Sequence, residues 1–143
     1  MSGQMFVYSF THHIVLVNGR EMENFGEGDD VVSYEYREDG VSDTVGADGN
    51  MQASVSANES AEITLKLLYS APENDYLEDL FYKFKRGLST GVTVAIINAV
   101  TGKAEVSTQG YIPKLASNSR GTKAQDREWM IVVPKLAIQK RTR

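Results

Sequence analysis

The chain has 143 residues, a length typical of a single domain that can bury a sizeable core. It contains no cysteine, which excludes disulfides and thiolate metal sites, and no apolar run long enough to cross a membrane. The first residues lack the basic segment and long apolar stretch of a signal peptide, so we expect a soluble protein of the cytoplasm.

Charge is divided unevenly along the chain, although the net charge is only −4. Residues 1–100 hold 16 acidic and 6 basic side chains, whereas residues 101–143 hold 3 acidic and 9 basic ones. Chance clustering on a solvated surface explains this division. An acidic face that meets a basic face of another copy also explains it, because complementary charge steers association. A basic tail that binds nucleic acid is the third interpretation.

Strand patterns dominate the first part of the chain. A strand is predicted over residues 6–10, where aromatic residues alternate with others, and a second over the β-branched run 13–17. Asn18-Gly19 predicts a tight hairpin turn, because both residues tolerate positive φ. The returning strand is expected over 20–24, and a further strand over 29–37.

The polar segment 38–50 holds two further turn signals, Asp39-Gly40 and Asp48-Gly49, and predicts an extended loop or a projecting hairpin. Two strands with regular alternation follow, over 51–57 and 60–69, and we expect them to pair. Each would then have one buried face and one small polar face in contact with water. The polar faces would consist of Gln52, Ser54 and Ser56 on the first strand and of Glu62, Thr64 and Lys66 on the second.

One amphipathic helix is predicted from Pro72 to just before Gly87, with Asn74 or Ser70 as the candidate cap. Acidic residues occupy its first half and basic residues its second half, the order that complements the helix dipole. Its apolar face, expected to bury against the sheet, consists of Tyr76, Leu77, Leu80, Phe81 and Phe84. Its exposed face is expected to include Glu73, Asp79, Lys83 and Arg86.

The last third of the chain returns to strand patterns. Residues 92–97 are nearly continuously apolar and predict a central strand, which Thr101-Gly102 turns back into a strand over 103–108. The segment 111–127 is rich in Ser, Asn, Gly, Lys and Arg and predicts a mobile loop, and 129–133 predicts a final strand.

These elements predict one domain over residues 1–143 with a mainly β fold. A single helix cannot cover eight or nine strands, so the sheet must close into an antiparallel β-barrel or fold into a two-layer sandwich, with the amphipathic helix packed on its side. Residues 139–143 form a basic C-terminal tail. The basic residues of the loop and the tail are interface candidates, namely Arg120, Lys123, Arg141 and Arg143.

No catalytic set can be assembled from the sequence. His12 and His13 are adjacent in a predicted strand, so their side chains should point to opposite faces. No serine lies in a G-x-S-x-G nucleophile elbow, and the segment 26–30 lacks the ligand spacing of a calcium loop. We therefore expect a protein that is not an enzyme and that needs no cofactor or metal.

Three runs of the sequence, in this order, resemble virion proteins of contractile-tailed phages. They are FGEGDDVV (25–32), VGADGNM (45–51) and SAEITLKLL (60–68), the last leading into SAPENDYL (70–77). The order of hairpin, projecting segment, paired strands and lone helix is similar to that of tail tube proteins in general.

This resemblance implies a structural role. Tail tube subunits form sixfold rings that stack, and their inner strands join into one barrel around a channel for DNA. The helix would lie outside that barrel, facing the sheath with the four charged residues named above. The segment 38–50 would reach the next ring. Its candidate stacking residues are Arg37, Glu38, Asp39, Asp43, Asp48 and Asn50.

The resemblance also implies partners and a location. The subunit would bind other copies of itself and the tail sheath, baseplate and tail terminator proteins, in a virion tail assembled in the host cytoplasm. The polar strand faces containing Gln52 and Glu62 would line the channel. DNA would pass without specific binding, since a neutral or acidic wall does not neutralise phosphates.

Three other functions stay open. A small β-barrel that binds a ligand or partner would be a stable monomer with an internal cavity. A hydrolase would need a pocket that places His12 or His13 beside an acid. Within the phage resemblance, a capsid decoration or tail-completion protein is the alternative.

Overall fold

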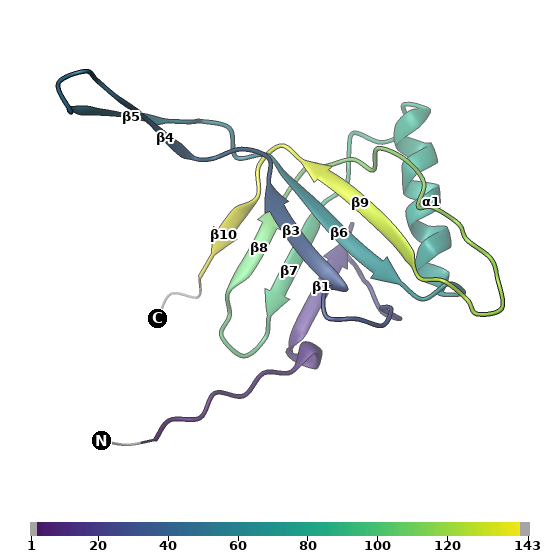
Figure 1. Cartoon of the computed structure of the whole chain (residues 1–143). Helices are drawn as coiled ribbons and strands as arrows, with labels where there is room; N and C mark the ends of the chain where they lie inside the picture. Colours follow the sequence, from purple (N-terminus) through teal and green to yellow (C-terminus); the bar gives the residue numbers. More distant parts are fainter. Residues whose placement is uncertain (1–2, 141–143) are drawn as a thin grey trace.

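The computed structural model describes residues 3–140 and shows a mainly β protein with one α-helix (Figure 1). The helix, α1, spans Pro72–Lys85, and a short 3₁₀ helix, η1, spans Phe10–His12. The strands are β1 (His13–Val17), β2 (Arg20–Glu21), β3 (Val32–Tyr36), β4 (Val41–Val45), β5 (Met51–Val55), β6 (Ala61–Leu67), β7 (Val94–Asn98), β8 (Ala104–Ser107), β9 (Arg127–Val133) and β10 (Ala137–Gln139).

The strands of the described residues form three antiparallel sheets. A five-stranded sheet has the order β10-β8-β7-β1-β2, a three-stranded sheet has the order β3-β6-β9, and β4 and β5 pair only with each other. The expected mainly β fold with antiparallel strands and one helix is confirmed. Within residues 3–140, however, the sheets do not close into a barrel.

One hydrophobic core joins the two larger sheets. On β6, buried apolar residues alternate with half-buried polar ones, as the two-residue period of a strand requires. The buried side chains of β6 share a cluster with Trp129 of β9, Val15 of β1, Ile96 of β7 and Leu77 of α1. In Figure 1 the three-stranded sheet accordingly overlies the five-stranded one, with α1 beside both.

Two local turn predictions are confirmed. Asn18 (φ 54°) and Gly19 (φ 84°) close the β1–β2 hairpin in the left-handed conformation that a type I′ turn demands. Gly102 (φ 76°) lies in the turn between β7 and β8. The apolar strand predicted over 92–97 is also confirmed, since β7 is the middle strand of its sheet.

Three strand predictions were wrong in position or pairing, and one strand was missed. Residues 6–10 form no strand; the segment before η1 runs away from the body instead (Figure 1). The strand returning from Gly19 is only Arg20–Glu21. Strand β5 does not pair with β6, because β6 lies between β3 and β9. The short strand β10 was not predicted at all.

Helix α1 ends where its sequence indicates, although its start is different in detail. Gly87 (φ 76°) follows the last turn, as expected of a C-terminal stop. Pro72 opens the first turn after Ala71, which offers no side-chain cap. Leu77 and Leu80 are buried in the core. No helix in residues 3–140 has the length and apolar character needed to cross a membrane.

The segment predicted as a mobile loop begins as packed structure. Tyr111 exchanges two backbone hydrogen bonds with Val132 of β9, at 2.9 and 2.8 Å, and so adds a short bridge to the three-stranded sheet. Ile112 and Ala116 are buried. The stretch 117–126 contains neither helix nor strand and is exposed.

Candidate assembly surfaces

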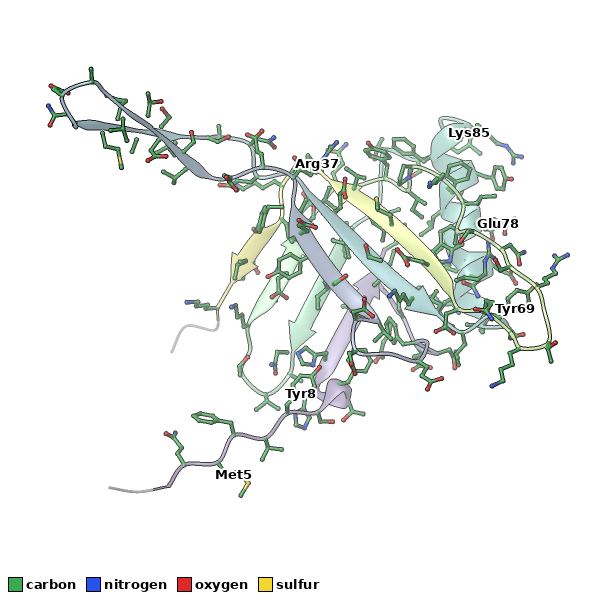
Figure 2. All side chains as sticks on the ribbon, in the orientation of Figure 1. Met5, Tyr8, Arg37, Tyr69, Glu78 and Lys85 are labelled. Carbon is green, nitrogen blue, oxygen red and sulfur yellow. The ribbon has the colours of Figure 1, made fainter. Side chains whose placement is uncertain are left out.

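The β4–β5 hairpin projects from the body of the subunit close to Arg37 (Figure 2). Every residue of both strands is exposed. The register places Val41 opposite Val55 and Val45 opposite Met51, so these four side chains share one face, with Asp43 and Ala53 between them. Val55 is 83% exposed. A lone two-stranded hairpin is at best marginally stable in water, so this apolar face indicates a contact outside the subunit.

The candidate stacking residues are distributed along this hairpin. Asp48 shapes the tip, where its carboxylate accepts hydrogen bonds from the backbone N and Nδ2 of Asn50 at 3.3 and 2.9 Å. Asp43 lies in the middle of the apolar face. At the base, Glu38 bonds the Ser56 hydroxyl, and Arg37 lies 3.8 Å from Glu62. Asp39 is exposed near the same end.

The grouping of the lumen candidates is corrected by the strand pairing. Gln52 and Ser54 belong to the polar face of the hairpin, opposite Thr44 and Ser42, and Ser56 follows directly after β5. They therefore lie on a different sheet from Glu62, and the expected common face does not exist. Alternation along a strand specifies which residues share a face, but it carries no information about the neighbouring strand.

The outer face of the three-stranded sheet, which we call the wetted face, does carry the other lumen candidates. Its exposed or half-buried members are Ser33, Glu35, Glu62, Thr64, Lys66, Glu128 and Met130, and the buried Val132 lies opposite Glu62 on the same face. Glu62 lies directly opposite Glu35, and Lys66 lies opposite Glu128. Like charges in register disfavour pairing, so the acidic character of this face is retained at some cost in stability.

The lysine of the wetted face is held by a carboxylate at its rim. Lys66 Nζ donates to Asp30 Oδ2 at 2.9 Å. This hydrogen bond and the lysine charge lower the pKa of Asp30, and the same hydrogen bond raises the pKa of Lys66. Both groups therefore stay charged at neutral pH. Arg37 pairs with Glu62 at 3.8 Å in the same way, which leaves Glu35 and Glu128 to set the sign of the face.

The helix faces require two corrections. Glu73, predicted to be exposed, is only 4% exposed, because it faces Arg20 at 3.7 Å and accepts a hydrogen bond from Asn24 at 2.9 Å. Phe84, predicted to be buried, is 39% exposed and stacks on Tyr111 instead. The other predicted core residues hold, with Leu77 and Leu80 buried and Tyr76 and Phe81 packed against the core. The remaining charged residues, Asp79, Lys83 and Arg86, are exposed.

A buried polar contact at the start of α1 was not predicted. Asn74 accepts a hydrogen bond from the indole nitrogen of Trp129 at 2.9 Å and donates to the carbonyls of Leu68 and Tyr69. The sequence suggests Asn74 as a helix cap, which is the common role of asparagine there. The structure uses it to fasten the helix to β9. The signal in the sequence was the lone tryptophan, whose N–H needs a partner when buried.

The structure describes two of the four basic interface candidates. Arg120 donates from Nε to the Tyr69 hydroxyl at 3.0 Å, and Lys123 is exposed on the same loop. Arg141 and Arg143 lie outside the described residues.

The hydrolase alternative needs a pocket that places a histidine beside an acid, and a hollow beside β1 contains both. His13, Asp29 and Glu105 line it, but no serine, threonine or cysteine does. Burial raises the pKa of Tyr34, whose hydroxyl lies 3.4 Å from Glu105, so this tyrosine stays protonated. Within residues 3–140, no three His, Cys, Asp or Glu side chains could jointly hold a metal ion.

Comparison with known structures shows the fold. A chain of the PVC sheath-tube complex of an extracellular contractile injection system, in the extended state, is similar with a TM-score of 0.67 and 16% identity, covering 95% of this chain and 93% of that one. The anti-feeding prophage tube-terminating cap aligns with a TM-score of 0.63 and 9% identity, covering 99% and 96%. The PVC sheath/tube terminator gives 0.62 and 15%, covering 96% and 99%.

Sequence comparison shows the family. A search of curated protein sequences found no significant match. The family profile described as Bacteriophage PhiTE tail tube protein matches residues 5–140, nearly the whole chain. Proteins of this family are structural components of phage tails rather than enzymes. The chain therefore belongs to the PhiTE tail tube protein family.

Proposed function

We propose that this chain assembles into stacked sixfold rings whose channel carries DNA during ejection. The β4–β5 hairpin is the observation that carries the proposal. It projects from the body, exposes an apolar face, and has no partner strand within the described residues other than its own return strand. A heterologous contact between this hairpin and an adjacent ring propagates without limit, as a tube requires.

The edges of the three-stranded sheet support closure of a ring. Strand β3 is an edge strand, and the opposite edge at β9 is extended by the short bridge at Tyr111. Pairing of β3 in one copy with the Tyr111 edge of the next continues the sheet from subunit to subunit. A closed ring of this kind removes the exposed edges that would otherwise invite aggregation.

In this arrangement the wetted face lines the channel. Glu35, Glu62 and Glu128 would then face the DNA, with Glu62 paired to Arg37 and Lys66 paired to Asp30. Such a wall repels phosphates and releases few counterions, so the duplex slides without being held. The polar hairpin face with Gln52 and Ser54 belongs to the contact between rings rather than to this wall.

The exposed charges of α1 are placed to meet an outer layer. Asp79, Lys83 and Arg86 point away from the core, and we assign them to contacts with a tail sheath. Baseplate and tail terminator proteins would bind at the two ends of the tube. Assembly would take place in the host cytoplasm.

The test is the assembly state of the purified protein. We expect rings and then tubes in electron micrographs as protein concentration rises, with sedimentation showing species far larger than the 15.8 kDa subunit. A strictly monomeric protein at every concentration contradicts the proposal. A stable monomer with a bound small molecule would instead support the ligand-binding alternative.

A further inference from the structure

The segment of residues 3–9, which we call the N-terminal arm, is the most exposed apolar part of the described chain. It runs away from the body before η1, and Figure 2 shows Met5 pointing into open space, whereas the Tyr8 ring at the base of the arm lies 5.7 Å from the His13 ring. Met5 and Phe6 are each 83% exposed, and Val7 and Tyr8 are each 77% exposed. Four consecutive large apolar residues cover both sides of an extended segment, a pattern that indicates burial on both sides.

A second apolar surface without a partner lies on the five-stranded sheet, on the side away from the core. Its register forms two rows, in which side chains from β1, β7, β8 and β10 lie beside one another. We call this surface the apolar outer face. Its members, all half-buried, are Ile14, Leu16, Ala95, Ile97, Ala104, Val106 and Ala137.

The arm and the apolar outer face match in charge and in size. Residues 3–11 contain no charged side chain, and the face has none between its rims at Glu21 and Lys140. An extended segment of residues 3–9 is about 23 Å long, and four neighbouring strands span about 14 Å, so the arm is long enough to reach across all four strands of the face. The end of one row, at Ile97 and Ala104, is hollowed.

The β4–β5 hairpin is a poorer occupant of this face. Asp43 lies at the centre of its apolar side, opposite Ala53. Packing that side on an uncharged surface would bury a carboxylate without a partner, which is strongly unfavourable. The hairpin therefore requires a receiving surface with a donor or a cation, whereas the arm requires none.

We propose that the N-terminal arm of one copy crosses the apolar outer face of a neighbouring copy and straps the two subunits together. The proposal rests on self-assembly as proposed above and adds a contact that the hairpin does not make. The partner is a second copy because the arm leads away from its own sheet (Figure 1).

Cysteine cross-linking tests which copy receives the arm. The chain has no native cysteine, so Phe6→Cys and Val106→Cys introduce the only thiols. We mix the two single variants, assemble them and oxidise the tubes. We expect a disulfide-linked heterodimer on a non-reducing gel, and none from the control mixture of Phe6→Cys with Thr64→Cys, which lies on the wetted face. Equal cross-linking in both mixtures, or none in either, overturns the inference.

A pair of variants tests the energetic contribution. Met5→Ser with Phe6→Ser, and separately Ile14→Thr with Ile97→Thr, should each raise the concentration needed for assembly about 100-fold. Combining all four changes should raise it no further, because both pairs remove the same contact. Leu88→Ser removes an equally exposed apolar side chain elsewhere and should change nothing.

The outcomes separate this inference from the proposed function. Circular dichroism confirms that each variant is folded. Wild-type protein that never assembles contradicts self-assembly itself. Tubes formed by the Met5→Ser, Phe6→Ser variant at the wild-type concentration, or fully additive effects of the two pairs, contradict only the strap.

Discussion

Two antiparallel strand pairs in this subunit show the same alternation of apolar and polar residues, but the apolar residues are buried in one pair and exposed in the other. In β6, paired with β9, residues Ala61, Ile63, Leu65 and Leu67 are buried completely. In β5, paired with β4, the alternating residues Met51, Ala53 and Val55 are all exposed. The first pair makes the core of one subunit, while the second presents an apolar face to something outside it. Regular alternation therefore identifies a surface that will be buried, but not whether the same chain buries it.

The largest expected effect comes from removing the exposed pair. Arg37 N donates to Ser60 O at 3.0 Å, so residues 38–59 can be replaced by Asn-Gly as a two-residue turn between them. We expect a folded subunit with near-normal thermal unfolding that forms no long tubes in electron micrographs.

A matched control accompanies the shortened protein. Glu59, which lies 3.8 Å from Lys135, is lost in the replacement, so Glu59→Ala with the hairpin intact should still form tubes. Long tubes from the shortened protein would show that the hairpin has no role in stacking.

Two substitutions to alanine, one in the core and one in the hairpin, compare how much each region contributes to the stability of the single subunit. Leu80→Ala removes a buried side chain from the interface of α1 with the core and should lower the free energy of unfolding by about 2–5 kcal/mol. Val55→Ala in the hairpin should change it by less than about 0.5 kcal/mol in the unassembled subunit. Urea unfolding measures both, and equal losses would mean that the hairpin packs on its own subunit.

The buried polar contact between α1 and β9 should have an intermediate effect. Asn74→Ala leaves the Trp129 indole N–H buried without an acceptor, which should lower the free energy of unfolding by about 1–3 kcal/mol. Asp75→Ala, one residue along on the exposed side of the helix, should cost less than about 0.5 kcal/mol. Tryptophan fluorescence during urea unfolding follows both variants, and identical midpoints would contradict the role given to Asn74.

The smallest expected effect is the pH dependence of the Asp30–Lys66 pair. The pKa of Asp30 is lowered in the folded state, so its contribution is present above the unfolded value of about 3.9 and is lost as pH falls through the folded value. Wild-type protein should thus be slightly more stable than Asp30→Asn near neutral pH, and the difference should vanish in strong acid. Urea midpoints at several pH values give the comparison, and a difference that grows on acidification would be inconsistent with it.

Sequence patterns predicted the elements that depend on residues close together in the chain. Proline and glycine bound α1, Asn18-Gly19 made the β1–β2 turn, and the alternation of β6 predicted its buried face, because each depends on local backbone preferences and periodicity. The family resemblance likewise rested on the order of such segments.

Long-range packing determines which surfaces meet. Local periodicity could not show that β5 leaves the body to pair with β4, that Arg20 and Asn24 bring Glu73 into the interior, or that Phe84 stays half-exposed. It also could not show that Ile14 and Ile97 lie side by side on an uncovered face. These outcomes depend on contacts between residues far apart in the chain, and a strand's two-residue period defines its faces without naming its neighbours.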